Sequence, residues 1–164
     1  MRINSLLLNR KLLYLGLLVG ASIIVIQSCK HTVGDCKGGE SKTSSAGDNE
    51  SHSMGENCLK CHNGKDEAPC FTLGGTVYDS ATVAPKTGGI LKLYTGPNGT
   101  GDLVKTIEVD GRGNFYTSKT INFIGGLYPS ITSKSGNTKY MGSPIQIGTC
   151  NSCHGATTSK ITVN

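Results

Sequence analysis

The sequence predicts an all-β fold, a small antiparallel β-sandwich, and three observations support this prediction. Short segments with period-two alternation recur along residues 71–147, as in LVKTIEVD, where Leu103, Ile107 and Val109 share one face of a predicted strand. Glycine-rich turns separate these segments at intervals of about 10 to 15 residues, and glycine is about twice as frequent as in average proteins. No segment after residue 28 has the length and periodicity of a helix.

Residues 1–28 are predicted to be a signal peptide. Residues 1–11 carry three basic side chains and no acidic one, and residues 12–26 form an uninterrupted run of apolar and small residues. The run has 15 residues, which is short of the roughly 20 that a membrane-spanning helix needs. We therefore expect the mature chain to be exported.

The end of this segment reads VIQSC, which places Cys29 after a small residue, Ser28, and a branched aliphatic residue, Ile26. This pattern resembles the lipobox of bacterial lipoproteins, in which the cysteine receives lipid and becomes the first residue. The resemblance implies a lipid anchor at Cys29 and a place on the outer membrane of a bacterium, at its periplasmic face or at the cell surface. The alternative is an ordinary signal peptide cut further along the chain.

Loss of the signal peptide removes three positive charges, so the formal net charge falls from +5 to +2. A weakly charged mature chain gives no reason to expect a nucleic-acid partner. Residues 29–57 are rich in Gly, Ser, Lys and acidic residues and contain few large apolar side chains. We expect this segment to be a flexible tether, because it cannot bury enough apolar surface to offset the entropy of ordering it.

The sandwich is expected to span residues 71–147 and to contain six strands. Turns are predicted at the glycine-rich sequences near positions 74, 88, 96, 110, 125 and 134. The predicted strand segments are 71–79, 88–96, 103–110, 113–121, 127–134 and 139–147.

Three motifs in residues 72–136 resemble the transthyretin-like, carboxypeptidase-regulatory type of β-sandwich. They are a Gly-x-Val opening strand in GGTVYDS, an Asp-x-x-Gly-Asn-Phe turn in DGRGNF, and a late Gly-x-Tyr strand in GGLYPS. The resemblance implies a transthyretin-like or immunoglobulin-like sandwich. Such sandwiches are usually structural or binding modules, so the resemblance implies no catalysis.

Two Cys-x-x-Cys-His motifs flank the predicted sandwich, in segments 58–70 and 148–164. The sequence contains only four histidines, and two of them directly follow a Cys-x-x-Cys pair. This motif is the one that attaches c-type haem. The motif residues are Cys58, Cys61, His62, Cys150, Cys153 and His154.

The spacing suits haem attachment. Two thiols with two residues between them can add to the two vinyl groups at one edge of a porphyrin, and the next residue then projects over the iron as an axial ligand. We therefore predict two covalently attached haem c groups, with His62 and His154 as the proximal iron ligands. The alternatives are one zinc site made by the four motif cysteines, or plain disulfides.

Ligands for the opposite side of each iron are scarce in this sequence. His52 and Met54 precede the first motif, and Met141 lies nine residues before Cys150. Each is a tentative ligand, although a methionine is more often core filler. If none of them binds, an iron stays open to small ligands.

Two further cysteines, Cys36 and Cys70, are left after lipid and haem attachment. They either form a disulfide or Cys36 stays loose. The order of segments also leaves the haem arrangement open, because the two motifs lie at the same end of the sandwich or at opposite ends, depending on strand direction.

These observations predict a membrane-anchored dihaem c-type cytochrome, an electron carrier rather than an enzyme. Its expected partners are redox proteins, either other cytochromes or a membrane oxidoreductase. The alternatives are a haem sensor or peroxidase-like protein with an open iron, and a structural or binding lipoprotein with a four-cysteine zinc site. No catalytic residues are predicted, since the sequence has no signature of hydrolysis or group transfer.

Overall fold

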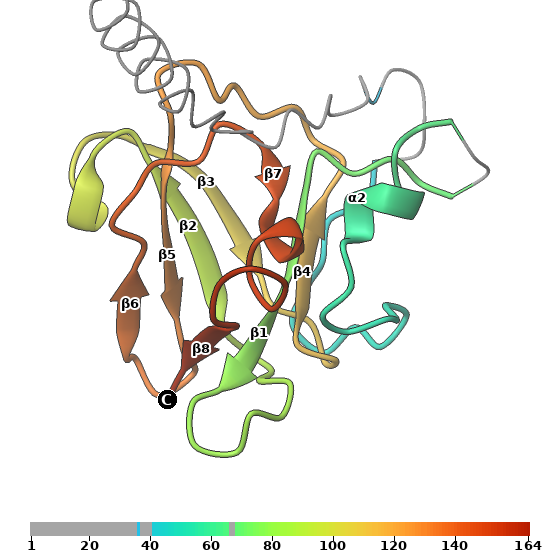
Figure 1. Ribbon diagram of the computed structural model, residues 1–164, viewed down its shortest axis with the longest axis horizontal. Helices are drawn as coiled ribbons and strands as arrows, with labels where there is room; N and C mark the ends of the chain where they lie inside the picture. The colour runs from blue at the N-terminus through green and yellow to red at the C-terminus, as the bar shows by residue number, and fades with distance from the viewer. Residues whose placement is uncertain (1–35, 37–40, 66–67) are drawn as a thin grey trace, which may run out of the picture. The chain divides into compact units, whose positions relative to one another are not determined.

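The structure, a computed structural model, describes residues 36, 41–65 and 68–164 (Figure 1). All of them belong to one compact unit, Thr32–Asn164. The predicted signal peptide and the predicted lipid attachment at Cys29 lie outside the described residues. Within the described ranges, no helix is both long and apolar enough to cross a bilayer.

Nearly all regular structure in these residues is extended. Two single helical turns coincide with the two Cys-x-x-Cys motifs, α2 (Cys58–Cys61) and a 3-10 turn (Cys150–Ser152), and a further 3-10 turn spans Pro97–Gly99. The strands are β1 (Leu73–Asp79), β2 (Ile90–Tyr94), β3 (Leu103–Glu108), β4 (Asn114–Thr117), β5 (Tyr128–Thr132), β6 (Thr138–Tyr140), β7 (Gly148–Thr149) and β8 (Ile161–Val163). Five of the six predicted strand segments contain one of β1 to β5, and the sixth, 139–147, overlaps β6 only at its first two residues. The predicted all-β sandwich is confirmed.

The strands form two sheets. In one sheet the order is β3-β2-β5-β6, and all pairings are antiparallel. In the other, β1 pairs antiparallel with β4 and parallel with β7 and β8. Because β7 and β8 pair with successive stretches of β1, the chain between them leaves the sheet at residue 150 and returns at residue 161 (Figure 1).

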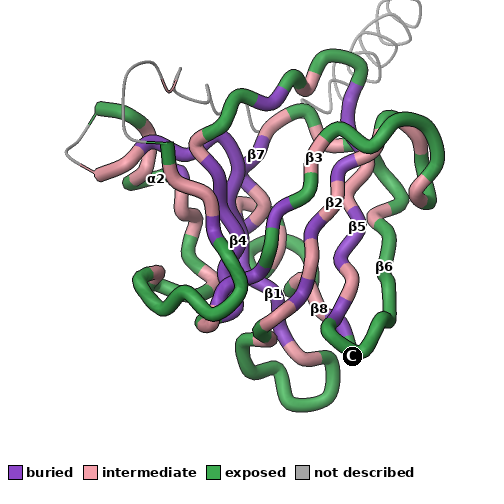
Figure 2. Tube along the Cα trace, turned by 180° about the vertical axis from the view of Figure 1, so that it is seen from behind, coloured by how far each residue is buried: buried purple, intermediate pink, exposed green. Residues whose placement is uncertain are grey.

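The core fills the space between the two sheets. Buried residues follow β1, β4, β2 and β5 (Figure 2). Burial of each large apolar side chain contributes about 1.5 to 3 kcal/mol to folding. The core residues are Leu73, Val77, Leu91, Leu93, Ile107, Val109, Phe115, Ile121, Leu127, Ile131 and Val163.

The glycine pair Gly74–Gly75 lies inside β1, so the predicted strand segment 71–79 is confirmed and the turn predicted near position 74 is wrong. Neither glycine has a positive φ, so conformational freedom is not the reason for glycine here. A Cβ on Gly75 would lie 2.5 Å from the Phe115 ring on the core side. A Cβ on Gly74 would lie 3.2 Å from Leu59 on the outer side. The glycines therefore permit close packing on both faces of β1.

The prediction of a flexible tether is wrong for residues 41–57, which lie along the sandwich. Thr43 forms an antiparallel bridge to Thr117 of β4. Ser44 is 3% exposed, and its amide donates to the Tyr116 carbonyl at 3.0 Å. The segment is held by backbone hydrogen bonds to the edge of β4, a source of stability that its low apolar content does not reveal.

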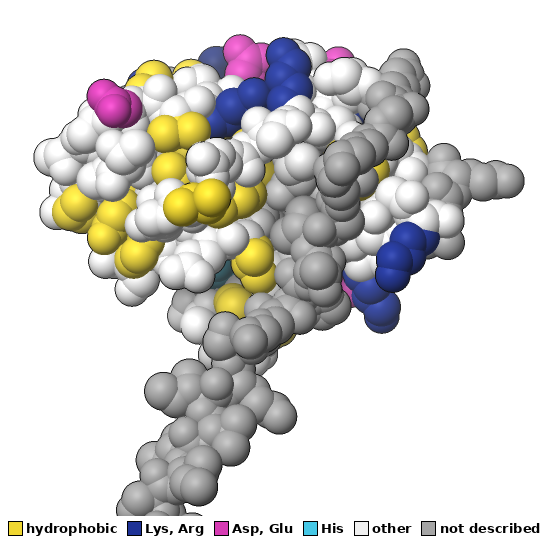
Figure 3. Space-filling model, turned by 90° about the horizontal axis from the view of Figure 1, so that it is seen from above, with side chains coloured by type: hydrophobic (Ala, Val, Ile, Leu, Met, Phe, Trp, Pro, Cys, Tyr) yellow, Lys and Arg dark blue, Asp and Glu magenta, His cyan; other side chains and the backbone are white. Residues whose placement is uncertain are grey.

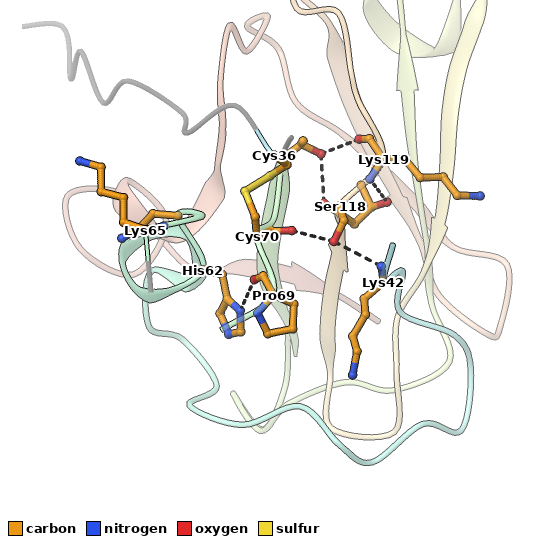
Figure 4. Close-up of a disulfide and its surroundings, with 11 residues drawn as sticks. Cys36, Lys42, His62, Lys65, Pro69, Cys70, Ser118 and Lys119 are labelled. Carbon is orange, nitrogen blue, oxygen red and sulfur yellow. Dashed lines mark hydrogen bonds between the residues drawn. A yellow bond between two sulfur atoms is a disulfide. The ribbon is translucent and has the colours of Figure 1, made fainter. Parts of the chain in front are cut away.

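A disulfide joins Cys36 to Cys70, which resolves the alternative left open for this pair (Figure 4). The Ser118 hydroxyl lies beside it, donating to the Cys70 carbonyl at 2.6 Å and accepting from the Lys42 amide at 3.3 Å. The bridge thus holds the N-terminal segment next to the chain that follows the first motif.

Removal of this disulfide is expected to lower the free energy of unfolding by about 2 to 4 kcal/mol, because the bridge closes a long loop in the unfolded chain. The measurement is denaturant unfolding of the variant Cys36→Ala/Cys70→Ala against the parent. A reducing agent should destabilise the parent to the same extent and leave the variant unchanged. Equal stability of parent and variant would contradict the expectation.

Candidate haem-attachment sites

The first motif forms one turn of helix on the outer face of the β4-β1 sheet. The His62 amide donates to the Cys58 carbonyl at 2.9 Å, which closes the turn from the first cysteine to the histidine. Leu59 is buried in a small apolar cluster with Phe71 and Tyr116. This anchoring leaves Cys61 exposed and Cys58 partly buried.

The His62 ring is fixed in orientation by a hydrogen bond and by stacking. Its Nδ1 lies 2.7 Å from the Pro69 carbonyl, and the ring stacks on Phe71 with centroids 4.1 Å apart. Because a carbonyl can only accept, Nδ1 carries the proton. The opposite nitrogen, Nε2, is then the atom with a lone pair to offer a metal.

A cavity of about 350 Å³ adjoins this turn. Cys58, Cys61 and His62 line it, together with the Phe71 and Tyr116 rings. His52 lines it too, and its ring centroid lies 5.9 Å from that of His62. Met54 is 41% exposed and is not among the residues that line the cavity.

The second motif repeats the local geometry of the first. The His154 amide donates to the Cys150 carbonyl at 3.0 Å. The His154 Nδ1 lies 2.8 Å from the Ser159 carbonyl, so the ring again presents Nε2 to a ligand. Cys153 is exposed and Cys150 partly buried, as in the first motif.

The cavity beside the second motif has a volume of about 420 Å³ and is lined by residues of β5 and β6 on one side and of β7 and β8 on the other. Met141 lines this cavity with Cys150, Cys153 and His154. Both cavities fall within the roughly 300 to 1,000 Å³ typical of ligand sites. The remaining walls of the second are largely apolar and include Leu91, Phe115, Pro129, Ile131, Pro144, Ile145 and Ile147.

The two motifs lie against opposite faces of β1. A Cβ on Gly74 would lie 3.0 Å from the Cys58 Cβ, and a Cβ on Gly75 would lie 2.9 Å from the Cys150 Cβ. Neighbouring residues of a strand face opposite ways, so the strand separates the two pairs of thiols. The described residues contain no group of three or more His, Cys, Asp or Glu side chains placed to hold one metal ion. This arrangement does not favour the four-cysteine zinc site.

The position of Cys150 is secured by the residue that follows it. Between the stretches of β1 that pair with β7 and β8, the Thr76 amide donates to the Asn151 side-chain oxygen at 3.1 Å. Asn151 thus replaces a backbone partner in the interrupted ladder. It is 5% exposed.

Burial changes the acidity of the first cysteine of each motif. Burial raises the pKa of the Cys58 thiol. Burial, followed by the nearby Cys58 charge, raises the pKa of the Cys150 thiol to about 12. Both groups are therefore neutral thiols at neutral pH.

Sequence reasoning identified the motif residues but missed those that support them. Pro69 and Ser159, which orient the histidines, lie seven and five residues after them. Because the two spacings differ, the sequence contains no repeated pattern that would identify Pro69 and Ser159 as the residues that orient the histidines. The glycine pair was a visible signal, since two adjacent glycines inside an alternating strand indicate close approach on both faces.

Alkylation of the chain with its motif thiols free is expected to be slowest at Cys150. The thiolate is the reactive form, and a pKa of about 12 leaves about a thousandfold less thiolate than an ordinary cysteine with a pKa near 8.5. The measurement is iodoacetamide labelling at pH 8 followed by peptide mass spectrometry. Labelling of Cys150 should accelerate as the pH rises or when denaturant is added. Equal rates at Cys150 and the exposed Cys153 at pH 8 would contradict the expectation.

Comparisons of the chain with protein-family models, with curated proteins and with solved structures give no match.

Proposed function

We propose that this protein is a membrane-anchored dihaem c-type cytochrome that passes single electrons between redox partners in the cell envelope. The observation that carries the proposal is the shared geometry of the two motifs. In each, a hydrogen bond closes the turn from first cysteine to histidine, and a backbone carbonyl holds the histidine Nδ1. This pattern leaves Nε2 of each ring as a metal ligand.

The residues present fit haem at both sites. Each motif places one exposed and one partly buried thiol beside a cavity whose walls include aromatic or aliphatic side chains. Bound haem would supply an iron that takes up and releases one electron. The protein would hold it through Cys58 and Cys61 at the first site and through Cys150 and Cys153 at the second, with His62 and His154 as proximal ligands.

His52 is the best-placed second ligand at the first site. Two imidazoles bound to one metal from opposite sides have ring centres about 6 Å apart, given metal–nitrogen bonds of about 2 Å. The His52 and His62 centroids are 5.9 Å apart, and both rings line the same cavity. The exposed Met54 is the weaker candidate.

Met141 is the corresponding candidate at the second site. It follows β6, and its amide donates to the Pro129 carbonyl at 2.9 Å, which fixes its backbone beside the cavity that His154 also lines. Methionine ligation raises the reduction potential of a haem relative to ligation by two histidines. We therefore infer that the second site has the higher potential and that electrons leave from it.

The proposed partners are redox proteins, either other cytochromes or a membrane oxidoreductase. Electron-transfer complexes are usually small and transient, and they need an accessible surface near the cofactor. The face in Figure 3 carries exposed hydrophobic side chains near basic and acidic ones. Lipid at Cys29 would keep the protein at the outer membrane.

The matured protein is expected to contain two covalently bound haems per chain. The measurement is a pyridine haemochrome assay combined with a haem-stained denaturing gel, because only covalently bound haem survives denaturation. The variant Cys150→Ala/Cys153→Ala should retain one haem. The matched control Cys36→Ala/Cys70→Ala removes two other cysteines and should retain both. A colourless matured chain, or one whose metal is zinc, would refute the proposal.

Substitution of the second ligands is expected to open the irons to carbon monoxide. The parent should bind little, whereas His52→Ala and Met141→Ala should each bind about one equivalent per chain, because each loses one axial ligand. Met54→Ala is the matched control and should behave as the parent. The measurement is an optical titration of the reduced protein. Strong binding by the parent would instead favour a sensor or peroxidase-like function.

A further inference from the structure

Two adjacent glycines of β1 lie between the two haem-attachment sites. A Cβ at Gly74 would approach the Cys58 Sγ to 3.3 Å as well as its Cβ to 3.0 Å, and a Cβ at Gly75 would approach the Cys150 Cβ to 2.9 Å. The space that side chains would fill is thus taken by the first cysteine of each motif. Since neighbouring Cα atoms are about 3.8 Å apart, one dipeptide touches both attachment points.

A chain of buried hydrogen bonds runs alongside this dipeptide. The Asn151 amide donates to the Thr76 hydroxyl at 3.2 Å, and this hydroxyl donates to the Asn114 side-chain oxygen at 2.6 Å. Asn114 in turn donates to the His52 carbonyl at 3.2 Å. The chain therefore leads from the residue after Cys150 to the candidate second ligand of the first site.

The region between the two sites is shielded from water. Thr76 is 1% exposed, Asn114 is 2% exposed and Phe115 is fully buried. A dry interior requires little solvent reorganisation when charge moves, and electronic coupling through protein falls steeply with the length of the path. Short contacts on both faces of one strand favour charge transfer within the molecule.

We propose that the Gly74–Gly75 dipeptide is the bridge through which the two haem sites exchange electrons. The inference rests on the proposed function. With haem bound at both sites, His62 and His154 would each hold an iron; one electron would pass from the ferrous iron of the first site, leaving it ferric, to the ferric iron of the second, making it ferrous, and no bond or proton would be transferred. The first iron is reduced beforehand by a one-electron donor protein, for which dithionite substitutes in the laboratory.

The bridge is tested by proton NMR of haem methyl groups in the full matured chain, partly reduced with dithionite. If electrons exchange rapidly within the molecule, the two one-electron-reduced forms give one averaged set of resonances, and dilution leaves this averaging unchanged. Separate resonances for the two forms would overturn the proposal. Averaging that disappears on dilution would overturn it too, because exchange would then be between molecules.

Alanine variants of the two glycines test whether the electron path runs through this dipeptide. Gly75→Ala must push Cys150 or Phe115 away, and Gly74→Ala must push Cys58 or Leu59 away; we expect either to slow the exchange several-fold. Gly142→Ala is the matched control, since a Cβ there meets nothing within 4 Å. Parental exchange in both bridge variants, with spectra of folded protein, would overturn the role of the dipeptide. If neither variant folds, the measurement on the parent still decides whether exchange is internal.

The haemochrome assay on the same NMR sample separates the two proposals. Fewer than two haems per chain would count against the proposed function itself. Two haems without internal exchange would leave the proposed function standing and remove the bridge.

Discussion

The packing of both Cys-x-x-Cys-His motifs against one strand is the constraint on which the rest of the structure depends. β1 pairs with β4, β7 and β8, so it organises its sheet. Both motifs also pack against it, Cys58 at Gly74 and Cys150 at Gly75. A side chain at Gly74 or Gly75 would require the neighbouring motif cysteine, or Leu59 or Phe115 beside it, to shift. The fold and the sites are therefore specified by the same few contacts, and a change in one affects the other.

The two sites differ although their local geometry is the same. The first lies on the outer face of the sheet, beside a stack of His62, Phe71 and Tyr116 rings, and includes a second histidine. The second opens from the core itself, with mostly aliphatic walls and a methionine. Different ligands and different burial are two of the means by which a protein sets haem potentials. Under the proposed function, this asymmetry would give the two sites different potentials and so favour electron flow in one direction.

The sequence was most informative where local pattern decides structure. β1 to β5 lie within the predicted alternating segments, whereas β7 and β8, of two and three residues, are too short to show a period. The glycine pair fits both a turn and the strand predicted over 71–79, because its packing partners, Cys58 and Cys150, are distant in sequence. Residues 41–57 were misread because backbone pairing with β4 leaves no trace in composition. His52 and Met141 were assigned to the first and second motif from their nearness in sequence, and the fold places each beside the cavity of that motif.

The side chain of Asn151 shows that the residue after the first cysteine has a different structural role in each motif. In the first motif the residue after the leading cysteine is Leu59. It is buried against Phe71 and Tyr116, so an apolar side chain stabilises the fold at this position. In the second it is Asn151, which completes a broken hydrogen-bond ladder and tolerates no apolar substitute without leaving the Thr76 amide unpaired. Two five-residue motifs that share three identities are thus not interchangeable parts. Each motif packs on its own face of β1. If one motif replaced the other, the cysteines and the histidine would be kept, but the contacts of Leu59 or of Asn151 would be lost.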